Sequence, residues 1–409
     1  MPTLGPVTRS RLIWPLLIAA LAAGAVAWPA HAGSTRAKPA GSRVPQGFAG
    51  MVVDEPVWPD PWINLQKQVD AMVASGVESL RVVFDWSAAQ PYQSWNDVPA
   101  NQKARFVNAG GVPTDFTAFD QLVTAASRDG LQVLPVVLAA PKWDGQNKKG
   151  AIISIPKTPG PYAAFVRALV KRYGPTGSFW QTYPYQTRVP IRMWQIWNEP
   201  NIYPFWPFQP FEARYVALLA ASRKAIRSVD PTAKVVLAGM PNYSWINLQR
   251  IYKIPGARNQ FDVVAIHPYT KEPRGVITIL GYVRQAMNQA GDTTKQIIAD
   301  EISWPSSIGK TNHNTGYDFA STESGQAQKI KQVLPMLVAN RKRLGLAGFY
   351  YYDWAGQERR NDLAFDFAGL FRESDGQFMA KPAWVSFAEG TLAMEGCHSK
   401  GHNAASCNP

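Results

Sequence analysis

The chain alternates between short runs of apolar and β-branched residues and longer segments with helical periodicity, and this alternation continues to its end. The predicted strand and helix pairs are 48–53 with 62–75, 79–86 with 116–128, 132–139 with 162–173, 191–197 with 211–228, 234–238 with 245–252, 261–266 with 276–290, 295–299 with 326–343, and 346–352 with 382–392. Eight successive βα units predict an α/β fold, the closed (β/α)8 TIM barrel.

An open, doubly wound sheet is the main alternative architecture. Such a sheet usually carries a glycine-rich phosphate loop after its first strand, whereas this chain reads VVDEP at residues 52–56. The 409 residues, 46% of them apolar, suffice for one barrel, which typically needs about 250 residues. We therefore expect a single main domain at residues 47–392.

The N-terminal residues have the features of an export signal. Two arginines precede an apolar run at residues 12–28, and the sequence AHA at residues 30–32 offers small residues where cleavage is expected. Residues 1–32 are thus predicted to be a signal peptide and residues 33–46 a linker, so that the protein is secreted or held in the cell envelope. An uncleaved membrane anchor is the alternative, because the apolar run is near the lower length limit for a span. After cleavage we expect no stable membrane association.

The only two cysteines, Cys397 and Cys407, lie in a C-terminal tail at residues 393–409. In an exported protein we expect them to form a disulfide that closes a short loop. Zinc binding is the alternative, but a structural zinc site needs about four ligands, and His398 and His402 have no further partners.

The net charge of +13 favours anionic partners. Nucleic acid is one such partner, but the basic residues are scattered, with short clusters such as residues 341–343, and no nucleic-acid-binding motif accompanies them. We expect a solvated basic surface and no nucleic-acid partner. A carbohydrate partner, including an acidic or cell-wall glycan, remains compatible with this charge.

Two predicted strands lead into a carboxylate at the start of a loop that contains a proline. The fourth reads MWQIWNEPN at residues 193–201 and presents Glu199, and the seventh reads QIIADEISWP at residues 296–305 and presents Glu301. Strand ends of a barrel meet at one mouth, where the chemistry of this fold takes place. Retaining cleavage of a glycosidic bond needs an acid and a nucleophilic carboxylate about 5–5.5 Å apart. The pair is therefore predicted to be catalytic.

Strict alternation along strand four would point Asn198 and Glu199 to opposite faces, so we expect a bulge or an early end of the strand at residues 197–199. Asp300 is the nearest competitor for the nucleophile, but the strand phase favours Glu301.

Three further residues are predicted to support the carboxylates. Arg81 is a charge embedded in an apolar strand, so it needs a carboxylate partner, with Glu301 favoured and a structural pair with Asp85 as the alternative. His267 ends strand six and is expected to hydrogen-bond the nucleophile or the sugar, unless it is an ordinary core histidine. Tyr269, from the same turn, is expected to hydrogen-bond the nucleophile.

Tryptophans follow or end several predicted strands. Flat aromatic rings stack on the apolar faces of sugars, so Trp86, Trp143 and Trp304 are predicted to contact substrate. Trp354 is predicted to be the platform beneath the reacting sugar. Trp197 is expected to pack in the core.

Residues 197–201, WNEPN, resemble the strand-four motif of the clan A retaining glycoside hydrolases. The chain looks most like family 39, with family 5 cellulase-like enzymes next, and the resemblance covers residues 47–392. It implies that Asn198 contacts the sugar 2-hydroxyl, that Glu199 is the acid/base and that Glu301 is the nucleophile.

The resemblance extends to other strand ends. It places Arg81 beside the nucleophile, matches His267 and Tyr269 to a histidine-x-tyrosine pattern on strand six, and matches Trp354 to a strand-eight tryptophan. Strand seven departs from the family pattern, because the residue before Glu301 is aspartate where threonine is familiar.

The function predicted from the sequence is that of a secreted retaining glycosidase, which cleaves O-glycosidic bonds of an oligo- or polysaccharide by double displacement without a cofactor or metal. A glycan-binding barrel without catalytic activity is the alternative. A metal-dependent barrel hydrolase is a weaker one, because such sites need several inward histidine or aspartate ligands and only His267 ends a predicted strand.

Overall fold

The structure is a computed structural model that describes residues 44–310, 318–358 and 363–408. The predicted signal peptide and most of the predicted linker lie outside the described residues. Within the described ranges, no helix combines the length and the apolar character that a membrane crossing needs.

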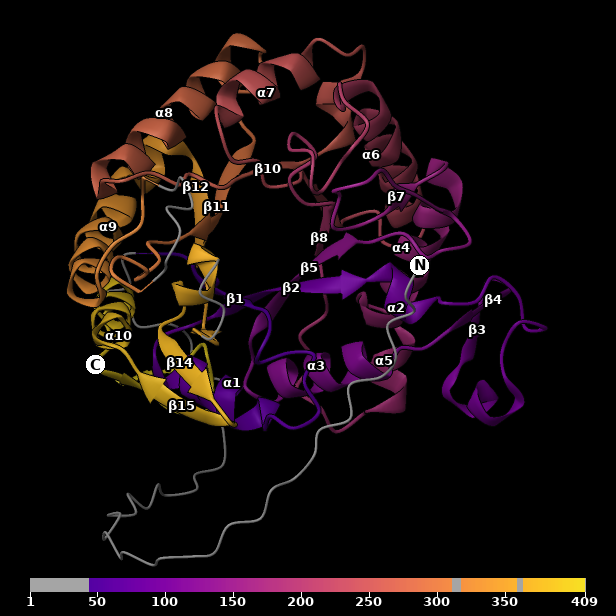
Figure 1. Cartoon of the computed structure of the whole chain (residues 1–409), viewed down its shortest axis with the longest axis horizontal. Helices are drawn as coiled ribbons and strands as arrows, with labels where there is room; N and C mark the ends of the chain where they lie inside the picture. The colour runs from indigo at the N-terminus through magenta and orange to yellow at the C-terminus, as the bar shows by residue number, and fades with distance from the viewer. Residues whose placement is uncertain (1–43, 311–317, 359–362, 409) are drawn as a thin grey trace, which may run out of the picture. The chain divides into compact units, whose positions relative to one another are not determined.

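Eight parallel strands close into a barrel in which the last strand pairs with the first (Figure 1). They are β1 (Ala49–Val53), β2 (Ser79–Asp85), β5 (Gln132–Leu138), β8 (Met193–Ile196), β9 (Lys234–Val236), β10 (Val263–Ile266), β11 (Gln296–Ile302) and β12 (Leu346–Tyr351). The order around the barrel follows the order along the chain. The predicted (β/α)8 fold is confirmed.

Helices follow the strands and lie on the outside of the barrel (Figure 1). The main ones are α1 (Leu65–Ala74), α3 (Thr117–Arg128), α4 (Pro159–Tyr173), α6 (Glu212–Arg227), α7 (Ser244–Tyr252), α8 (Pro273–Gln289), α9 (Glu323–Leu344) and α10 (Pro382–Glu395). Shorter elements in the loops include α2 (Trp86–Ala89), α5 (Ser178–Thr182), the hairpins β3–β4 (Val107–Ala109, Val112–Thr114) and β6–β7 (Gly145–Gln146, Ile155–Pro156), and a small sheet of β13 (Ala355–Gly356), β14 (Phe371–Ser374) and β15 (Gln377–Ala380).

Strand alternation divides the core into two parts. On β1, Met51 and Val53 join the large core beneath the helices, whereas Val52 joins a smaller cluster inside the barrel. Val52 is in register with Arg81 of β2, which is in register with Leu134 of β5, another member of the inner cluster. Arg81 therefore belongs to the inward-facing row, which explains how a buried arginine reaches the centre of the barrel.

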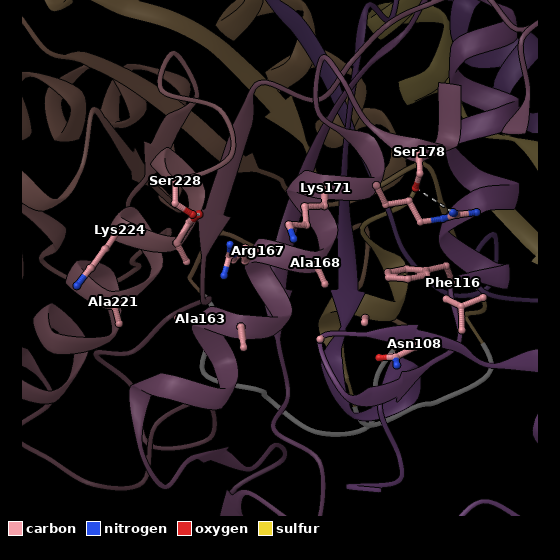
Figure 2. Close-up of a pocket in the computed structure, with 16 residues that line it drawn as sticks. Asn108, Phe116, Ala163, Arg167, Ala168, Lys171, Ser178, Ala221, Lys224 and Ser228 are labelled. Carbon is pink, nitrogen blue, oxygen red and sulfur yellow. Dashed lines mark hydrogen bonds between the residues drawn. The ribbon is translucent and has the colours of Figure 1, made fainter. Parts of the chain in front are cut away.

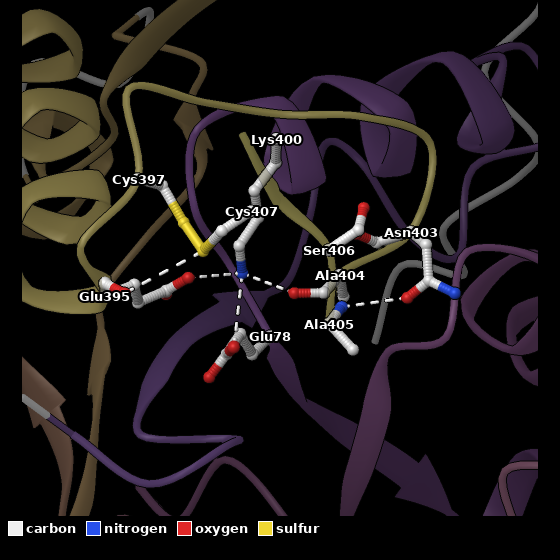
Figure 3. The surroundings of a disulfide bond; sticks show 9 residues. All are labelled: Glu78, Glu395, Cys397, Lys400, Asn403, Ala404, Ala405, Ser406 and Cys407. Atoms are coloured by element: carbon white, nitrogen blue, oxygen red, sulfur yellow. Dashed lines mark hydrogen bonds and ion pairs between the residues drawn. A yellow bond between two sulfur atoms is a disulfide. The ribbon is translucent and has the colours of Figure 1, made fainter. Parts of the chain in front are cut away.

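The C-terminal tail is part of the folded unit. Cys397 and Cys407 form a disulfide that closes a loop containing β16 (Ser399–Lys400) and β17 (Cys407–Asn408) (Figure 3). From this loop the buried Lys400 ammonium approaches Glu395 Oε2 at 2.6 Å and Glu78 Oε1 at 3.3 Å. Because Glu78 directly precedes β2, the tail is tied to the end of the barrel opposite the strand C-termini.

Candidate active site

Arg81 forms the centre of a buried polar network. Its Nη1 donates to Glu301 Oε1 at 2.7 Å and its Nη2 donates to Asn198 Oδ1 at 2.7 Å. Its Nε donates to Gln195 Oε1 at 2.9 Å and lies 3.1 Å from Asp300 Oδ2. One guanidinium thus connects side chains from β8 and β11, because its planar fork offers donors in three directions. The structure joins Arg81 to Glu301, and not to Asp85.

Glu199 reaches the same mouth because β8 ends early. The strand stops at Ile196, and Trp197 and Glu199 both have positive φ values, 71° and 44°. Few non-glycine residues adopt this conformation, which costs energy that the surrounding contacts must supply. The backbone N–H of Glu199 donates to the Gly239 carbonyl at 2.9 Å, beside the end of β9. The departure from the strand lets both Asn198 and Glu199 contribute to the site.

His267 joins the two carboxylates. It follows β10, and its Nδ1 lies 2.7 Å from Glu199 Oε1. Its Nε2 lies 3.4 Å from carboxylate oxygens of both Glu301 and Asp300, at ion-pair distance. Carboxylate oxygens of Glu199 and Glu301 and a ring nitrogen of His267 all lie within 4.8 Å of one another. The structure therefore brings the two predicted catalytic acids together, about as far apart as retaining glycoside cleavage requires.

An irregularity in β11 places Asp300 and Glu301 in one network. The sequence predicted that this strand ends at residue 299, but it continues through Ile302, and its pairing with β12 shifts register between Ala299 and Ile302. Such a bulge re-aims side chains that alternation would send to opposite faces. The Asp300 side chain is fully buried, whereas that of Glu301 is 10% exposed. Of these two acids, Glu301 is the one that solvent or substrate can reach.

Tyr269 forms part of an aromatic wall beside Glu301. Its hydroxyl donates to Glu301 Oε2 at 2.5 Å. Its ring stacks on Phe319 at 5.0 Å and meets the edge of Phe365 at 5.3 Å. Glu301 thus receives hydrogen bonds on both oxygens, one from the guanidinium of Arg81 and one from this phenol.

The electrostatics follow from burial and from the two cations. Burial raises the pKa of Glu301, and Glu199 and Asp300 raise it further, whereas His267 and Arg81 lower it. Burial would lower the pKa of His267, but Glu301 and Asp300 raise it to about 10. Burial opposes the ionisation of Asp300, yet His267 and Arg81 hold its pKa below the usual value. At neutral pH the site therefore contains an imidazolium and an ionised Asp300.

The prediction of a sugar contact is wrong for three of the four tryptophans to which it was applied. Trp86, Trp304 and Trp354 are fully buried. Their indole N–H groups donate to Gln90, to the Thr270 carbonyl and to Gln68, respectively. They pack as core residues with no face open to a ligand.

The correction for Trp354 has a specific cause. The segment after β12 is the small sheet of β13, β14 and β15, and Phe371 of β14 packs on the Trp354 ring at 4.7 Å. Trp143 is half-buried, with its N–H donating to the Gln90 carbonyl, so its position leaves the prediction of a substrate contact open. As expected, Trp197 packs in the core.

Sequence reasoning missed three residues at the mouth. Gln195 is fully buried and links Arg81 to Asp300, to which its amide donates at 2.6 Å. Tyr352 is half-buried directly after β12, two residues before the tryptophan that the sequence singled out. Asp54 follows β1, where burial, with Glu301 contributing, raises its pKa to about 6. Asp54 comes directly after a predicted strand and Tyr352 is the last residue of another, and these positions were the signal that could have identified them.

Glu199, His267 and Glu301 also form the kind of cluster that can bind a metal ion. Here the guanidinium of Arg81 and the imidazolium of His267 already supply positive charge to these carboxylates. A second cluster, Glu395 with the two cysteines, offers no thiolates because they form the disulfide. The donor set at the mouth thus fits proton transfer and carboxylate chemistry better than metal ligation.

A groove of about 770 Å3 lies elsewhere, on the outside of the barrel between α4, α6 and the β3–β4 hairpin (Figure 2). Alanines of α4 and α6 line it, together with the cations Arg167, Lys171 and Lys224. None of the residues that line it is acidic. The groove lacks the paired carboxylates of the mouth and is separate from the candidate active site.

No protein-family model matches the chain, and no curated protein sequence matches it. Solved structures do match. A glucosidase from Croceicoccus marinus is 14% identical with a TM-score of 0.59, and the match covers 89% of this chain and 70% of that one. The GH53 catalytic domain of Ignisphaera aggregans is 20% identical with a TM-score of 0.51, covering 86% and 98% of the two chains.

The GH30 xylanase C catalytic domain of Talaromyces cellulolyticus is 13% identical with a TM-score of 0.53, covering 86% of this chain and 76% of that one. These matches show that the chain shares the (β/α)8 barrel fold of the three proteins. At these identities the similarity describes the barrel alone. A function for this chain therefore has to be argued from the residues at the mouth of its barrel, among them the pair Glu199 and Glu301.

Proposed function

We propose that the protein is a secreted, retaining glycoside hydrolase that cleaves O-glycosidic bonds of an oligo- or polysaccharide. The observation that supports this most is the approach of the Glu199 and Glu301 carboxylate oxygens to within 4.8 Å. That spacing suits direct attack by one carboxylate on the anomeric carbon, whereas an inverting enzyme needs a wider gap, about 6.5–9.5 Å, to admit a water molecule.

In the first step, a carboxylate oxygen of Glu301 attacks the anomeric carbon and the bond to the leaving oxygen breaks. Glu199 gives its proton to that leaving oxygen. Arg81 and Tyr269 hold the nucleophile in place through its two oxygens. Asn198, fixed by Arg81 through its carbonyl oxygen, keeps its amide N–H groups for a sugar hydroxyl.

In the second step, water attacks the same carbon and its proton passes to Glu199, while the bond to Glu301 breaks. Glu199 therefore cycles between its neutral and ionised forms. His267, whose Nδ1 lies 2.7 Å from Glu199 Oε1, holds this carboxyl group in position through both steps. Asp300 balances the charge of the imidazolium throughout the cycle.

The test is to replace the two carboxylates separately, as Glu301→Ala and Glu199→Gln, and to screen the purified proteins against aryl glycosides and cell-wall polysaccharides. Each variant should lose turnover by orders of magnitude while its circular dichroism spectrum is unchanged. Glu389→Gln, an exposed carboxylate on α10, is the matched control and should retain full activity.

Two further measurements separate the alternatives. A mechanism-based fluoroglycoside should label Glu301, and the first-formed product should keep the anomeric configuration of the substrate. Unchanged hydrolysis in the Glu301→Ala protein, or inversion of configuration, would contradict the proposal. Binding of glycans without labelling or turnover would indicate a glycan-binding barrel, which the burial of three predicted sugar-stacking tryptophans makes a weaker candidate.

The finer assignments belong to the same proposal. The WNEPN motif at residues 197–201 supports a place near family 39, with family 5 next. The two arginines before the apolar run at residues 12–28, with AHA at residues 30–32, support secretion or residence in the cell envelope. Among the structural neighbours, the Talaromyces protein is named a xylanase and a fungal pair β-1,4-galactanases, which supports a polysaccharide as the substrate class.

A further inference from the structure

A small acidic cavity lies beside the candidate active site. It measures about 80 Å3 and sits at the ends of β1 and β12, where Glu55, Tyr352, Asp353 and Asp366 contribute to its walls. Glu55 is exposed at its rim. Three of its seven lining residues carry a carboxyl group, and none of the seven carries a positive charge.

Asp353 gives this cavity a polar group that is ready to bind a ligand. The residue is 4% exposed, and its Oδ1 has no hydrogen-bond partner among the described residues. A buried carboxyl oxygen without a partner costs free energy, unless a ligand or water supplies the missing donor. Burial and the nearby Asp54 raise the pKa of Asp353 well above its usual value. The charge of Lys381 lowers the pKa of Asp353, but its ammonium group hydrogen-bonds Glu358 and a backbone carbonyl.

The cavity adjoins the reacting centre through a chain of aromatic contacts. Tyr352 lines it and meets the edge of Phe365 at 5.7 Å, and Phe365 meets Tyr269 at 5.3 Å. Tyr269 in turn donates to Glu301. The charges of Glu301 and Glu199 also act on the Tyr352 hydroxyl, so this wall of the cavity lies near the two carboxylates.

We propose that this cavity is a specificity subsite for the free amino group of an amino sugar, at or beside the sugar that Glu301 attacks. The inference rests on the proposed function and names its substrate class. An ammonium group has three N–H donors, which suit Asp353 Oδ1, the Tyr352 hydroxyl and a rim carboxylate. The cavity has room for an exocyclic amine together with a water molecule.

The positive net charge of the chain, +13, does not oppose this assignment. Charges on the outer surface are screened over roughly 8 Å at physiological ionic strength, whereas Asp353 and its neighbours act at contact distance. The local field at the mouth therefore determines which substituent is preferred. An N-acetylated sugar would bring a larger, uncharged group with a single N–H donor, and a neutral sugar would bring one hydroxyl.

The experiment measures binding by calorimetry, so that it needs no turnover. The probes are glucosamine, galactosamine and mannosamine, each compared with its neutral parent sugar and its N-acetyl derivative. We expect at least one amino sugar to bind about tenfold or more tightly than both of its relatives, because hydrogen bonds to charged groups are the strong ones. Binding should also release a proton as Asp353 ionises, which titrations in two buffers of different ionisation enthalpy will detect.

Asp353→Asn keeps the shape of the side chain and should abolish both the preference and the proton release. Glu55→Gln, at the exposed rim, should weaken the preference, and it tests the subsite if the Asp353→Asn protein does not fold. The control, Glu389→Gln, should leave binding unchanged. If no amino sugar binds more tightly than its relatives, or if Asp353→Asn retains the preference, the subsite is disproved. Fluoroglycoside labelling of Glu301 is scored separately, so that failure of the subsite and failure of the glycosidase assignment give different results.

Discussion

Arg81 is one inward-facing side chain that holds together residues from distant strands at the mouth of the barrel. Its guanidinium binds Glu301 and Asn198 directly and approaches Asp300. Isolated buried charges are too costly to persist, so the arginine and its carboxylates require one another. The sequence could indicate this dependence because a lone charge interrupted an apolar strand.

Replacing Arg81 by lysine tests whether the fork geometry matters as well as the charge. Lysine keeps one positive charge but lacks the two separate nitrogens with which Arg81 hydrogen-bonds Glu301 and Asn198 at the same time. The proposed nucleophile and the Asn198 amide should therefore lose their alignment. We expect kcat to fall about 100-fold. Steady-state kinetics on an active glycoside checks this, and a lysine variant with unchanged kcat would mean that charge alone suffices.

The charge of His267 should appear in the pH dependence of stability. Its pKa of about 10 in the folded protein exceeds the usual value of 6.5, so the folded state binds the proton more tightly than the unfolded state does. The resulting stabilisation is fully present below pH 6.5 and is lost as the pH rises through 10.

His267→Gln should therefore flatten the decline of the free energy of unfolding between pH 6.5 and 10, as measured by urea denaturation. His402→Gln, at an exposed position in the tail, should leave that decline as it is in the parent protein. An equally steep decline in the His267→Gln protein would show that the imidazolium is not its source.

Charged residues were easier to predict from the sequence than aromatic ones. The structure brings together Arg81, Glu199, Glu301 and His267. A charged group within an apolar strand or at its end has few other reasons to be there. Tryptophan, in contrast, is equally at home in a core and at a sugar site. Whether loops cover a given ring depends on tertiary packing, which the sequence pattern does not reveal.

At the scale of elements, the alternation predicted all eight strands, with errors at their ends. The predicted end of β11 at residue 299 was too early, because Asp300 looks like a polar stop, whereas inside a barrel it joins a network of opposite charges. The structure of the segment after β12 was not predicted at all. Its short strands pair through backbone hydrogen bonds and carry no long periodic pattern.

Gly239, just after β9, allows the close packing of three strand ends. A methyl group added there would overlap His267 Nε2 and Asp300 Oδ2. Gly239→Ala should therefore displace the imidazole, lower activity about 100-fold and cost about 1–3 kcal/mol of stability.

Gly281→Ala on α8 is the matched control, because a methyl group there meets open space. It should retain activity and raise stability by about 0.5–1 kcal/mol. Thermal unfolding and kinetics on both variants check the pair, and equal effects of the two substitutions would refute a steric role for Gly239.

At the scale of the whole molecule, the disulfide secures the end of the chain. Cys397 and Cys407 are 10 positions apart, and closing a loop of this length should contribute about 2–3 kcal/mol. Replacing both cysteines by alanine should lower the free energy of unfolding by that amount.

The same loss should occur when a reductant is added to the parent protein, and the reductant should have no effect on the alanine variant. Urea denaturation with and without reductant measures both. Equal stability of the oxidised, reduced and alanine proteins would mean that the loop is held by its other contacts, such as the hydrogen bond from the Ala404 N–H to the Asp129 carbonyl.

Lys400, in the loop closed by the disulfide, determines how far the C-terminal end of this protein can be shortened. Expression of the eight βα units alone, ending at residue 392, would remove Lys400 and leave the Glu78 carboxylate without that counter-ion in a buried position. Losing one member of a buried ion pair typically costs about 3–5 kcal/mol, so the trimmed product should be recovered mainly as insoluble material. Affinity tags and fusion partners at this end belong beyond residue 408, where the chain has already been tied to the underside of the barrel.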